Sequence, residues 1–475
     1  MSDSARFRVE KDLLGERRVP AQAYYGVQTL RALENFSISG IPVSHFPDLV
    51  ISLAMVKKAC AEANRKLGKL QSNQADVIAA ACDEVIRGEW HGEFCVDMIQ
   101  GGAGTSTNMN ANEVIANRAL ELLGHERGDY EHLHPNIHVN MSQSTNDVYP
   151  TALRLAMIFG LRQLAAATEA LRGALAEKGA EFQPILKMGR TQLQDAVPMS
   201  LGQEFNAFAT TIGEEVARLR ELAALLSEVN LGGTAIGTGL NTESEYRDIA
   251  LEQLRTIAGV PVTAAADLVE ATSDMGGFVL LSGMLKRTAI KLSKICNDLR
   301  LLSSGPRCGL NEINLPQKQP GSSIMPGKVN PVIPEAVNQV AFNVIGNDTA
   351  VTMAAEAGQL QLNVMEPLIG FKLLESIRYL GAAMEALRRD CIEGITANEE
   401  VCRSYLQRSI GLVTALNPYL GYGKTSQIAQ KALQTGRSVA ELVLEEKLLS
   451  PEELERLLSP ESMTAPRPGG LDAAV

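Results

Sequence analysis

Two long segments of the chain repeat apolar residues at alternating spacings of three and four positions. One segment runs from Leu201 to Val229, and the other runs from Phe278 to Leu302. This spacing predicts an apolar stripe along a helix of about seven turns or more, which is longer than the average helix of a globular protein. Helices of this length pack lengthwise against similar partners, so the pattern predicts a helix bundle.

Two further segments have compatible patterns and extend the predicted bundle. They run from Thr151 to Phe182 and from Glu335 to Ile395, and Pro367 is expected to bend or break the second. An ordinary coiled coil is the alternative, but the intervening loops are too rich in unusual polar residues for it. Strand-like alternation extends no further than a short hairpin would need, so the sequence predicts an all-α fold.

The expected division of the chain follows these helical segments. We expect an N-terminal domain over 1–141, a central long-helix bundle over 142–397 and a small C-terminal domain over 398–475. Both terminal domains are expected to be helical and smaller than the bundle. The tail after Ser459 is expected to fray.

Composition supports helix and narrows the class of partner. Aromatic residues make up only 4% of the 475 residues, whereas Ala, Leu, Glu and Gln recur, which favours helix over sheet. The net charge of −11 argues against nucleic acid as the main partner, because phosphate binding needs a basic face. The chain shows no apolar stretch of about 18 residues and no apolar segment near its start, and its seven cysteines form no CxxC pair. We therefore expect a cytoplasmic protein with free thiols that crosses no membrane.

Four loops are dense in Ser, Thr, Asn or Gln, and each contains or follows glycine. Each is expected to precede a helix, with capping-box spacing at Asn110–Glu113 and at Ser144–Asp147. Neutral donors beside helix N-termini form a cradle for carboxylates. One such loop is usually only a helix cap, but four together, with Lys328 in the last, predict a carboxylate-binding site. The loops are Gly101–Asn112, Asn140–Asp147, Gly189–Asp195 and Gly321–Pro331.

The last of these loops reads GSSIMPGKVNP and resembles the signature loop of the aspartase/fumarase superfamily. Three other segments match substrate-binding segments of that superfamily in the same order, at Thr105, Ser144–Asn146 and Thr191. The resemblance implies a four-carbon dicarboxylate as substrate and a homotetramer built on a central helix bundle, in which each active site takes loops from three subunits. The two apolar stripes support the same expectation of assembly, since one protomer cannot readily bury them.

The resemblance also implies roles for the polar residues of the loops. Ser322 corresponds to the base that removes a proton from C3, a role that is plausible for serine only beside backbone amides and a lysine. The resulting aci-carboxylate needs donors aimed at its oxygens. No cofactor or metal is implied, and activation by a divalent cation is left open. The β-carboxylate would be held by Thr105, Ser144, Thr145 and Ser323, the α-carboxylate by Lys328, Asn330 and Thr191, and the amino group by Asn146.

One substrate-binding position, Gln192, discriminates between reactions. Fumarases place a histidine after the threonine of the Gly-Arg-Thr segment, whereas this chain has Gln192, and all six histidines precede residue 139. An imidazole suits a hydratase that activates water, but a neutral amide suffices where an amine leaves. At this position the chain therefore resembles the aspartases, which implies deamination of L-aspartate to fumarate. The alternatives are a class II fumarate hydratase and, more remotely, a catalytically silent helical scaffold, and the role of Glu335, which pairs with that histidine in fumarases, stays open.

Three further features have simpler interpretations. Gly423–Thr425 lacks the first glycine of a phosphate-binding loop and is expected to be a solvated turn. The glycine-rich run Leu231–Leu240 does not follow an expected strand, which disfavours dinucleotide binding and leaves it as a candidate lining of the active site. His132, His134 and His138 have a spacing that could bind metal, but they fall in what resembles a secondary surface loop of the superfamily, so no metal is expected.

Overall fold

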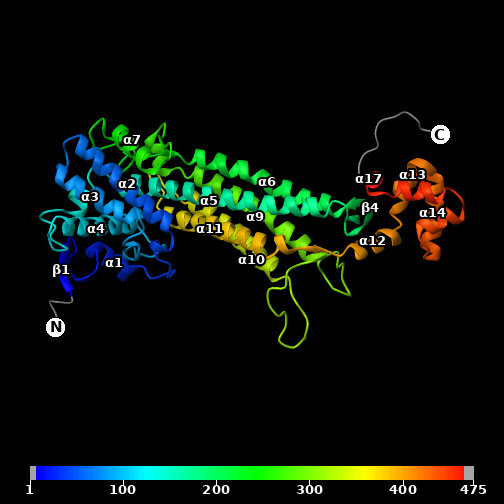
Figure 1. Cartoon of the computed structure of the whole chain (residues 1–475). Helices are drawn as coiled ribbons and strands as arrows, with labels where there is room; N and C mark the ends of the chain where they lie inside the picture. Colours follow the sequence, from blue (N-terminus) through cyan, green and yellow to red (C-terminus); the bar gives the residue numbers. More distant parts are fainter. Residues whose placement is uncertain (1–6, 465–475) are drawn as a thin grey trace. The chain divides into compact units, whose positions relative to one another are not determined.

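A computed structural model describes residues 7–464, and most of them are helical (Figure 1), which confirms the predicted all-α fold. Within residues 7–464, no helix is both long enough and apolar enough to cross a membrane. The helices are α1 (Val27–Asn35), α2 (Pro47–Lys66), α3 (Ser72–Ile86), α4 (Thr105–Leu122), α5 (Thr145–Glu181), α6 (Leu201–Leu225), α7 (Tyr246–Ala258), α8 (Leu268–Ser273), α9 (Gly276–Leu302), α10 (Val332–Glu356), α11 (Glu366–Asp390), α12 (Glu399–Arg408), α13 (Leu412–Leu420), α14 (Tyr422–Thr435), α15 (Val439–Glu445), α16 (Pro451–Leu457) and α17 (Pro460–Met463).

The strands are few and form only two-stranded pairs. Two pairs are antiparallel hairpins, β1 (Phe7–Asp12) with β2 (Gly15–Pro20) and β3 (Leu186–Thr191) with β4 (Gln194–Ser200). The other pairs join strands of two residues each: β5 (Glu228–Val229) with β6 (Thr263–Ala264), and β7 (Ile313–Asn314) with β8 (Thr396–Ala397).

The described chain divides into two compact units, each built from three separate segments. Unit 1 contains residues 7–165, Ala217–Ala289 and Phe342–Gly381, and unit 2 contains Ala166–Val216, Ile290–Ala341 and residues 382–464. The expected division into three domains at 141 and 397 stays a prediction. The expected fraying of the tail concerns mainly residues 465–475, which lie outside the described residues, whereas Pro460–Met463 form the short helix α17.

Unit 1 packs the N-terminal helices around α2. Helix α2 contacts both α3 and α7, and α4 contacts α1 and α3. In the same unit Ser282 and Lys286 of α9 bind Asp348 of α10, with distances of 2.8 and 2.6 Å. These polar contacts fix the registers of the long helices within unit 1.

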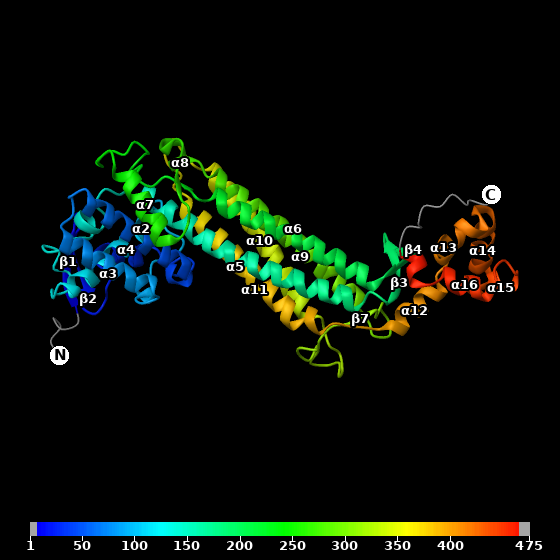
Figure 2. The same cartoon turned by 45° about the horizontal axis from the view of Figure 1, so that its top comes forward.

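Unit 2 combines long-helix segments with the C-terminal helices. Asn338 of α10 donates to the Ser293 hydroxyl of α9 at 2.8 Å, and Lys291 of α9 pairs with the buried Glu215 of α6 at 2.6 Å. Helices α13, α14 and α15 lie in contact near the C-terminus (Figure 2) around an apolar cluster that includes Leu416 and Leu442.

The long helices match the predicted segments. Helix α6 covers most of the first apolar run, α9 covers the second, and α5 covers Thr151–Phe182 to within one residue. The run 335–395 is broken as expected, because α10 ends at Glu356 and Pro367 occupies the first turn of α11. The argument that one protomer cannot bury the two stripes is wrong. All their apolar positions are buried within the chain: Leu201, Phe205, Phe208, Ile212, Val216, Leu219, Leu222, Leu226 and Val229 in the first, and Phe278, Leu281, Leu285, Leu292, Ile295, Leu299 and Leu302 in the second.

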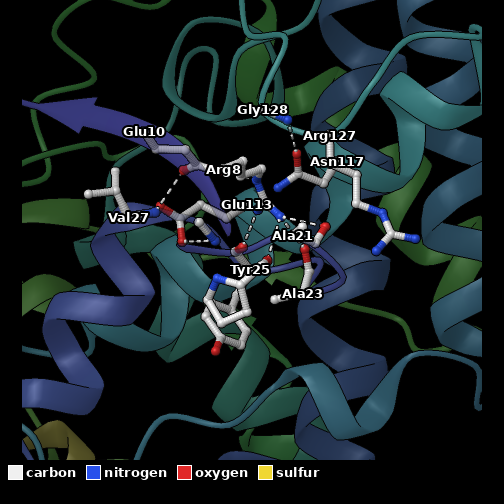
Figure 3. A network of polar contacts seen from close by, with 12 residues as sticks. Arg8, Glu10, Ala21, Ala23, Tyr25, Val27, Glu113, Asn117, Arg127 and Gly128 are labelled. Carbon is white, nitrogen blue, oxygen red and sulfur yellow. Dashed lines mark hydrogen bonds and ion pairs between the residues drawn. The ribbon is translucent and has the colours of Figure 1, made fainter. Parts of the chain in front are cut away.

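Buried carboxylates hold the N-terminal end of α1 against α4 (Figure 3). Glu113 of α4 accepts the backbone N–H groups of Gly26, Gln28 and Thr29, which are free donors at the start of α1. Beside it, Glu10 accepts the N–H of Val27 at 2.8 Å. Because burial outweighs these donors, the pKa of Glu113 is raised to about 7. The expected capping box at Asn110–Glu113 is therefore wrong: both residues lie inside α4, where Glu113 caps a different helix.

Candidate functional site

The ten candidate residues of the sequence fall into two groups, one in each unit. The first group lies in unit 1 and consists of Thr105, Ser144, Thr145 and Asn146. The second group lies in unit 2 and consists of Thr191, Gln192, Ser322, Ser323, Lys328 and Asn330.

Two helices of unit 1 begin at residues of the first group. Thr105 is exposed and opens α4 after Gly104, whose φ of +89° and close contact with the Tyr149 ring leave no room for a Cβ. Thr145 opens α5, and its hydroxyl accepts a hydrogen bond from the Asn108 amide at 3.0 Å. The contact links the N-terminal ends of α4 and α5, whose partial positive charges favour an anion.

A buried cation supports this pair of helix ends. The Lys57 ammonium of α2 donates to the side-chain oxygens of Asn108, Asn140 and Gln143, at 2.6, 2.9 and 2.8 Å. Lys57 is fully buried, and burial lowers its pKa to about 8. Lys57 is not among the residues that the sequence predicts for the site. Two lysines, Lys57 and Lys58, in a stretch of otherwise apolar and small residues from Ile51 to Ala61 were the available signal.

The turn before α5 carries the rest of the first group. The expected capping box at Ser144–Asp147 is present in part: Asp147 accepts the N–H of Ser144 at 2.9 Å, and the Ser144 hydroxyl accepts the N–H of Asn146 at 3.2 Å. Asp147 is fully buried, and burial raises its pKa to about 6. The sequence predicts Asp147 only as a member of a capping box, and no local pattern indicates a further role for this carboxylate.

The second group starts on a β-hairpin, not on a loop that leads directly into a helix. Thr191 ends β3, and Gln192 and Leu193 form the turn with φ values of +54° and +61°. The segment Gly189–Asp195 does precede a helix, α6, but the strand β4 lies between them. Thr191 and Gln192 are exposed at the tip.

Four buried or half-buried charges anchor the base of this hairpin. Lys187 of β3 pairs with Glu204 at 2.5 Å and with Glu312 at 2.7 Å, and Arg190 pairs with Glu312 at 2.7 Å. Glu312 and Lys187 are almost completely inaccessible to solvent. The ion pairs hold Arg190 and therefore fix the strand residue that precedes Thr191.

The signature loop of unit 2 surrounds the Ser322 hydroxyl with backbone donors. Its oxygen accepts the N–H groups of Ile324 at 3.2 Å and Met325 at 3.0 Å. Both donors stabilise negative charge on that oxygen. A serine that acted as a base would require donors of this kind.

The ends of the loop are joined at Gly321. Its N–H donates to the Lys328 carbonyl at 2.7 Å, and its own carbonyl accepts the Asn330 amide at 2.8 Å. A Cβ on Gly321 would lie 2.5 Å from the Lys328 carbonyl oxygen, so the closure requires glycine. Ser323 and Lys328 are exposed, and Lys328 has no ion-pair partner within residues 7–464.

Two further predictions concern residues near these groups. Glu335 lies 3.9 Å from Arg300, a distant and half-exposed ion pair. The glycine-rich run does follow a strand, contrary to expectation, but β5 has only two residues, and the next helix begins at Tyr246. This arrangement lacks the strand–turn–helix geometry of a dinucleotide site.

The histidines of the N-terminal region are held by local contacts. The Nδ1 atoms of His134 and His138 accept backbone N–H groups of Asn136 and His134, at 3.0 and 2.8 Å. His125 and His132 lie 3.5 and 3.7 Å from Asp129, as ligands of a metal would. Their rings are stacked at 3.8 Å and nearly parallel, so in this arrangement both cannot aim a nitrogen lone pair at one ion.

Most of the chain matches known protein families. Residues 15–346 match the family described as Lyase, and residues 412–465 match the family described as Fumarase C C-terminus. The chain is 67% identical over 468 residues to the aspartate ammonia-lyase of Pseudomonas fluorescens, covering 98% of each protein. It is 57% identical over 464 residues to the aspartate ammonia-lyase of Escherichia coli strain K12, covering 98% of this chain and 97% of that protein.

Two solved structures share the fold. The crystal structure of fumarate lyase:delta crystallin from Brucella melitensis bound to cobalt has a TM-score of 0.94 and 58% identity, covering 97% of this chain and 100% of that chain. The structure of recombinant class II fumarase from Schistosoma mansoni has a TM-score of 0.89 and 36% identity, covering 96% and 99%.

Proposed function

The chain belongs to the aspartase/fumarase superfamily of lyases, and we propose that it catalyses the reversible deamination of L-aspartate to fumarate and ammonia. The geometry at Ser322 is the observation that carries the proposal. Two backbone N–H groups converge on its hydroxyl oxygen, on a loop that also contains Lys328, which has no ion-pair partner among the described residues. Relatives with 57–67% identity over nearly the whole chain are aspartate ammonia-lyases.

In the proposed reaction, Ser322 acts as the base. Its deprotonated oxygen takes the proton from C3 of L-aspartate, and the electron pair of the C–H bond moves into the β-carboxylate to form an aci-carboxylate. That pair then returns to form the C2–C3 double bond while the C2–N bond breaks and ammonia leaves. The hydroxyls of Thr105, Ser144, Thr145 and Ser323 supply hydrogen bonds to the oxygens where charge develops.

The other candidate residues hold the remaining groups of the substrate. Lys328 supplies the positive charge for the α-carboxylate, and Asn330 and Thr191 supply neutral donors. Asn146 contacts the amino group. All of these steps use side chains of the chain itself, so the proposal includes no cofactor, and activation by a divalent cation is left open.

Gln192 favours deamination over hydration. An amide can donate and accept hydrogen bonds, but it cannot move a proton at neutral pH. Glu335, the carboxylate that would orient a histidine at this position, faces Arg300 instead. Class II fumarate hydratase is the second candidate, favoured by the structural similarity to the fumarase of Schistosoma mansoni.

We also propose a homotetramer with active sites shared between subunits, in the cytoplasm. Between Glu335 and Glu356, helix α10 carries one charged residue, Asp348, which Lys286 neutralises. Phe342 and Met353 on this helix are 62% and 68% exposed. A helix that exposes large apolar side chains and almost no charge is typical of a subunit interface.

The test of the proposed reaction uses the purified full chain with fumarate, with and without ammonium. L-aspartate should form only with ammonium, and malate should be negligible in both samples. If malate forms as fast as aspartate, the chain is a hydratase, and Gln192 carries no information about the reaction. If neither product forms, the scaffold alternative gains support.

A further inference from the structure

The segment 144–147 is bound to the glycine-rich run Leu231–Leu240 by one carboxylate. Asp147, fully buried in unit 1, accepts the N–H of Ser144 with one oxygen at 2.9 Å. Its other oxygen accepts the N–H groups of Gly232 and Thr234, each at 3.0 Å. A single side chain therefore fixes both segments relative to each other.

A second set of contacts fixes Asn146 itself. The Asn146 amide nitrogen donates to the Ala235 carbonyl at 2.7 Å, and the Asn146 carbonyl accepts the Asn230 amide at 2.9 Å. Because a backbone carbonyl can only accept, the NH₂ end of the Asn146 side chain must face Ala235. Its Oδ1 atom therefore points away, and it has no hydrogen-bond partner within residues 7–464.

The backbone path that places the Ala235 carbonyl depends on glycine. Gly237 has a φ of +93°, and a Cβ there would lie 2.3 Å from the Leu268 carbonyl oxygen. Gly232 has a φ of +90°, and its Cβ would lie 2.8 Å from the Arg247 side chain. The run is thus a close-packed support for Asn146, which gives it a purpose other than phosphate binding.

We propose that Asp147 is a positioning residue that, through the run Leu231–Leu240, keeps the Asn146 Oδ1 atom turned toward the substrate as an acceptor for its ammonium group. The inference rests on the proposed function and adds the origin of amine selectivity. An ammonium group offers three N–H donors to an acceptor oxygen, whereas fumarate has no donor at the corresponding carbon. Loss of the arrangement should therefore weaken the binding of L-aspartate and leave the binding of fumarate unchanged.

The test compares Asp147→Asn with the wild type in both directions of the reaction. The amide cannot accept at the nitrogen that replaces one carboxylate oxygen, so the support for Asn146 is lost at nearly constant volume. We expect the KM for L-aspartate, and the KM for ammonium in the reverse reaction, to rise about tenfold, the equivalent of one charge-assisted hydrogen bond. The KM for fumarate should stay within about twofold of the wild-type value.

Asp97→Asn is the matched control. Asp97 is another buried carboxylate of unit 1 that accepts backbone N–H groups, those of Ile38, Ser39 and Gly40. Its loss should lower the melting temperature without changing the ratio of the two KM values. If Asp147→Asn does not fold, Asn230→Ala removes the other tether of Asn146 and should shift the same ratio about threefold.

The outcomes separate the two proposals. If the wild type forms no aspartate, the proposed function fails, whatever the variants do. If the wild type forms aspartate but both KM values rise together in Asp147→Asn, or neither rises, Asp147 is a purely structural residue and the inference is overturned.

Discussion

A serine hydroxyl becomes a base only when its environment stabilises the alkoxide. At Ser322 two backbone N–H groups point at the oxygen, and they cost no reorganisation because the loop is already closed through Gly321. Lys328, on the same loop, adds a positive charge. The proposed roles differ, with Ser322 as the base and Lys328 as the partner of a carboxylate, so removal of each side chain should have different kinetic consequences.

Ser322→Ala should lower kcat for L-aspartate by about a thousandfold or more, because the hydroxyl acts mainly in the transition state. Binding of L-aspartate, measured by calorimetry, should persist. Lys328→Ala serves as the contrast, since it deletes the charge that pairs with a ground-state carboxylate and should mainly raise KM. A Ser322→Ala variant that keeps a tenth of the wild-type kcat would remove Ser322 from the role of base.

The pKa of Lys57 predicts a pH dependence of stability. The folded chain holds this pKa near 8, below the ordinary value of about 10.5, so between these values the unfolded chain binds more protons. The free energy of unfolding should therefore gain about 3 kcal/mol from Lys57 as pH rises from 8 to 10.5, and lose it again as pH falls from 10.5 to 8. Lys57→Met should lack this contribution. The free energy of unfolding of the wild type and of Lys57→Met is measured by urea denaturation between pH 8 and 10.5. The difference between the two proteins isolates the contribution of Lys57, because the cysteine thiols titrate in both. If the free energy of unfolding depends on pH in the same way in both proteins, the prediction is wrong.

The sequence points to only some of the residues of the candidate site, for a physical reason. Ser322 and Lys328 stand in a short loop whose composition is unusual by itself. Lys57 gains its meaning from Asn108, which is 51 positions away, and Asp147 from Gly232, which is 85 positions away. Contacts at such separations exist only after the chain folds, so no local pattern announces them.

Among the elements, the long helices were predictable and the hairpin was not. A helix of the length of α9 repeats its apolar face many times, so the signal accumulates along the sequence. The β3–β4 turn instead uses Gln192 and Leu193 in left-handed conformations that usually call for glycine or asparagine. Without those residues the sequence carries no turn signal, and the segment resembles a loop before a helix.

Glu312 stabilises the β3–β4 hairpin through its ion pairs with Lys187 and Arg190, so its removal should destabilise the hairpin. Glu312→Ala removes one ion-pair partner from Lys187, which keeps Glu204. The same change removes the ion pair between Arg190 and Glu312. Breaking a buried ion pair in this way costs about 3–5 kcal/mol, so the melting temperature should fall and the hairpin should lose its fixed position. Because Thr191 lies at its tip, the KM for L-aspartate should rise as well. An unchanged melting temperature would show that the charges are already solvated.

At the scale of the whole molecule, the proposed assembly accounts for two separate observations. The candidate residues divide between unit 1 and unit 2, and α10 exposes Phe342 and Met353 in a stretch whose one charged residue, Asp348, is paired. Sharing of active sites between subunits would explain both, because an interface would cover Phe342 and Met353 and complete each site with residues from neighbouring chains.

Mixing two inactive variants tests this sharing directly. Thr105→Ala disables the group of unit 1, and Ser322→Ala disables the group of unit 2. If each active site takes the two groups from different subunits, dissociating and reassembling an equal mixture should produce intact sites and restore about a quarter of the wild-type activity. If both groups come from the same chain, every site contains one defect and the mixture should stay as inactive as its components.

Sedimentation gives the necessary control, since the wild type and the reassembled mixture should both have a mass near four times 51.1 kDa. Phe342→Glu should shift the protein toward smaller species with loss of activity. A fully active monomer would contradict the shared site, whereas a tetramer without complementation would keep the assembly and place each complete site within one chain.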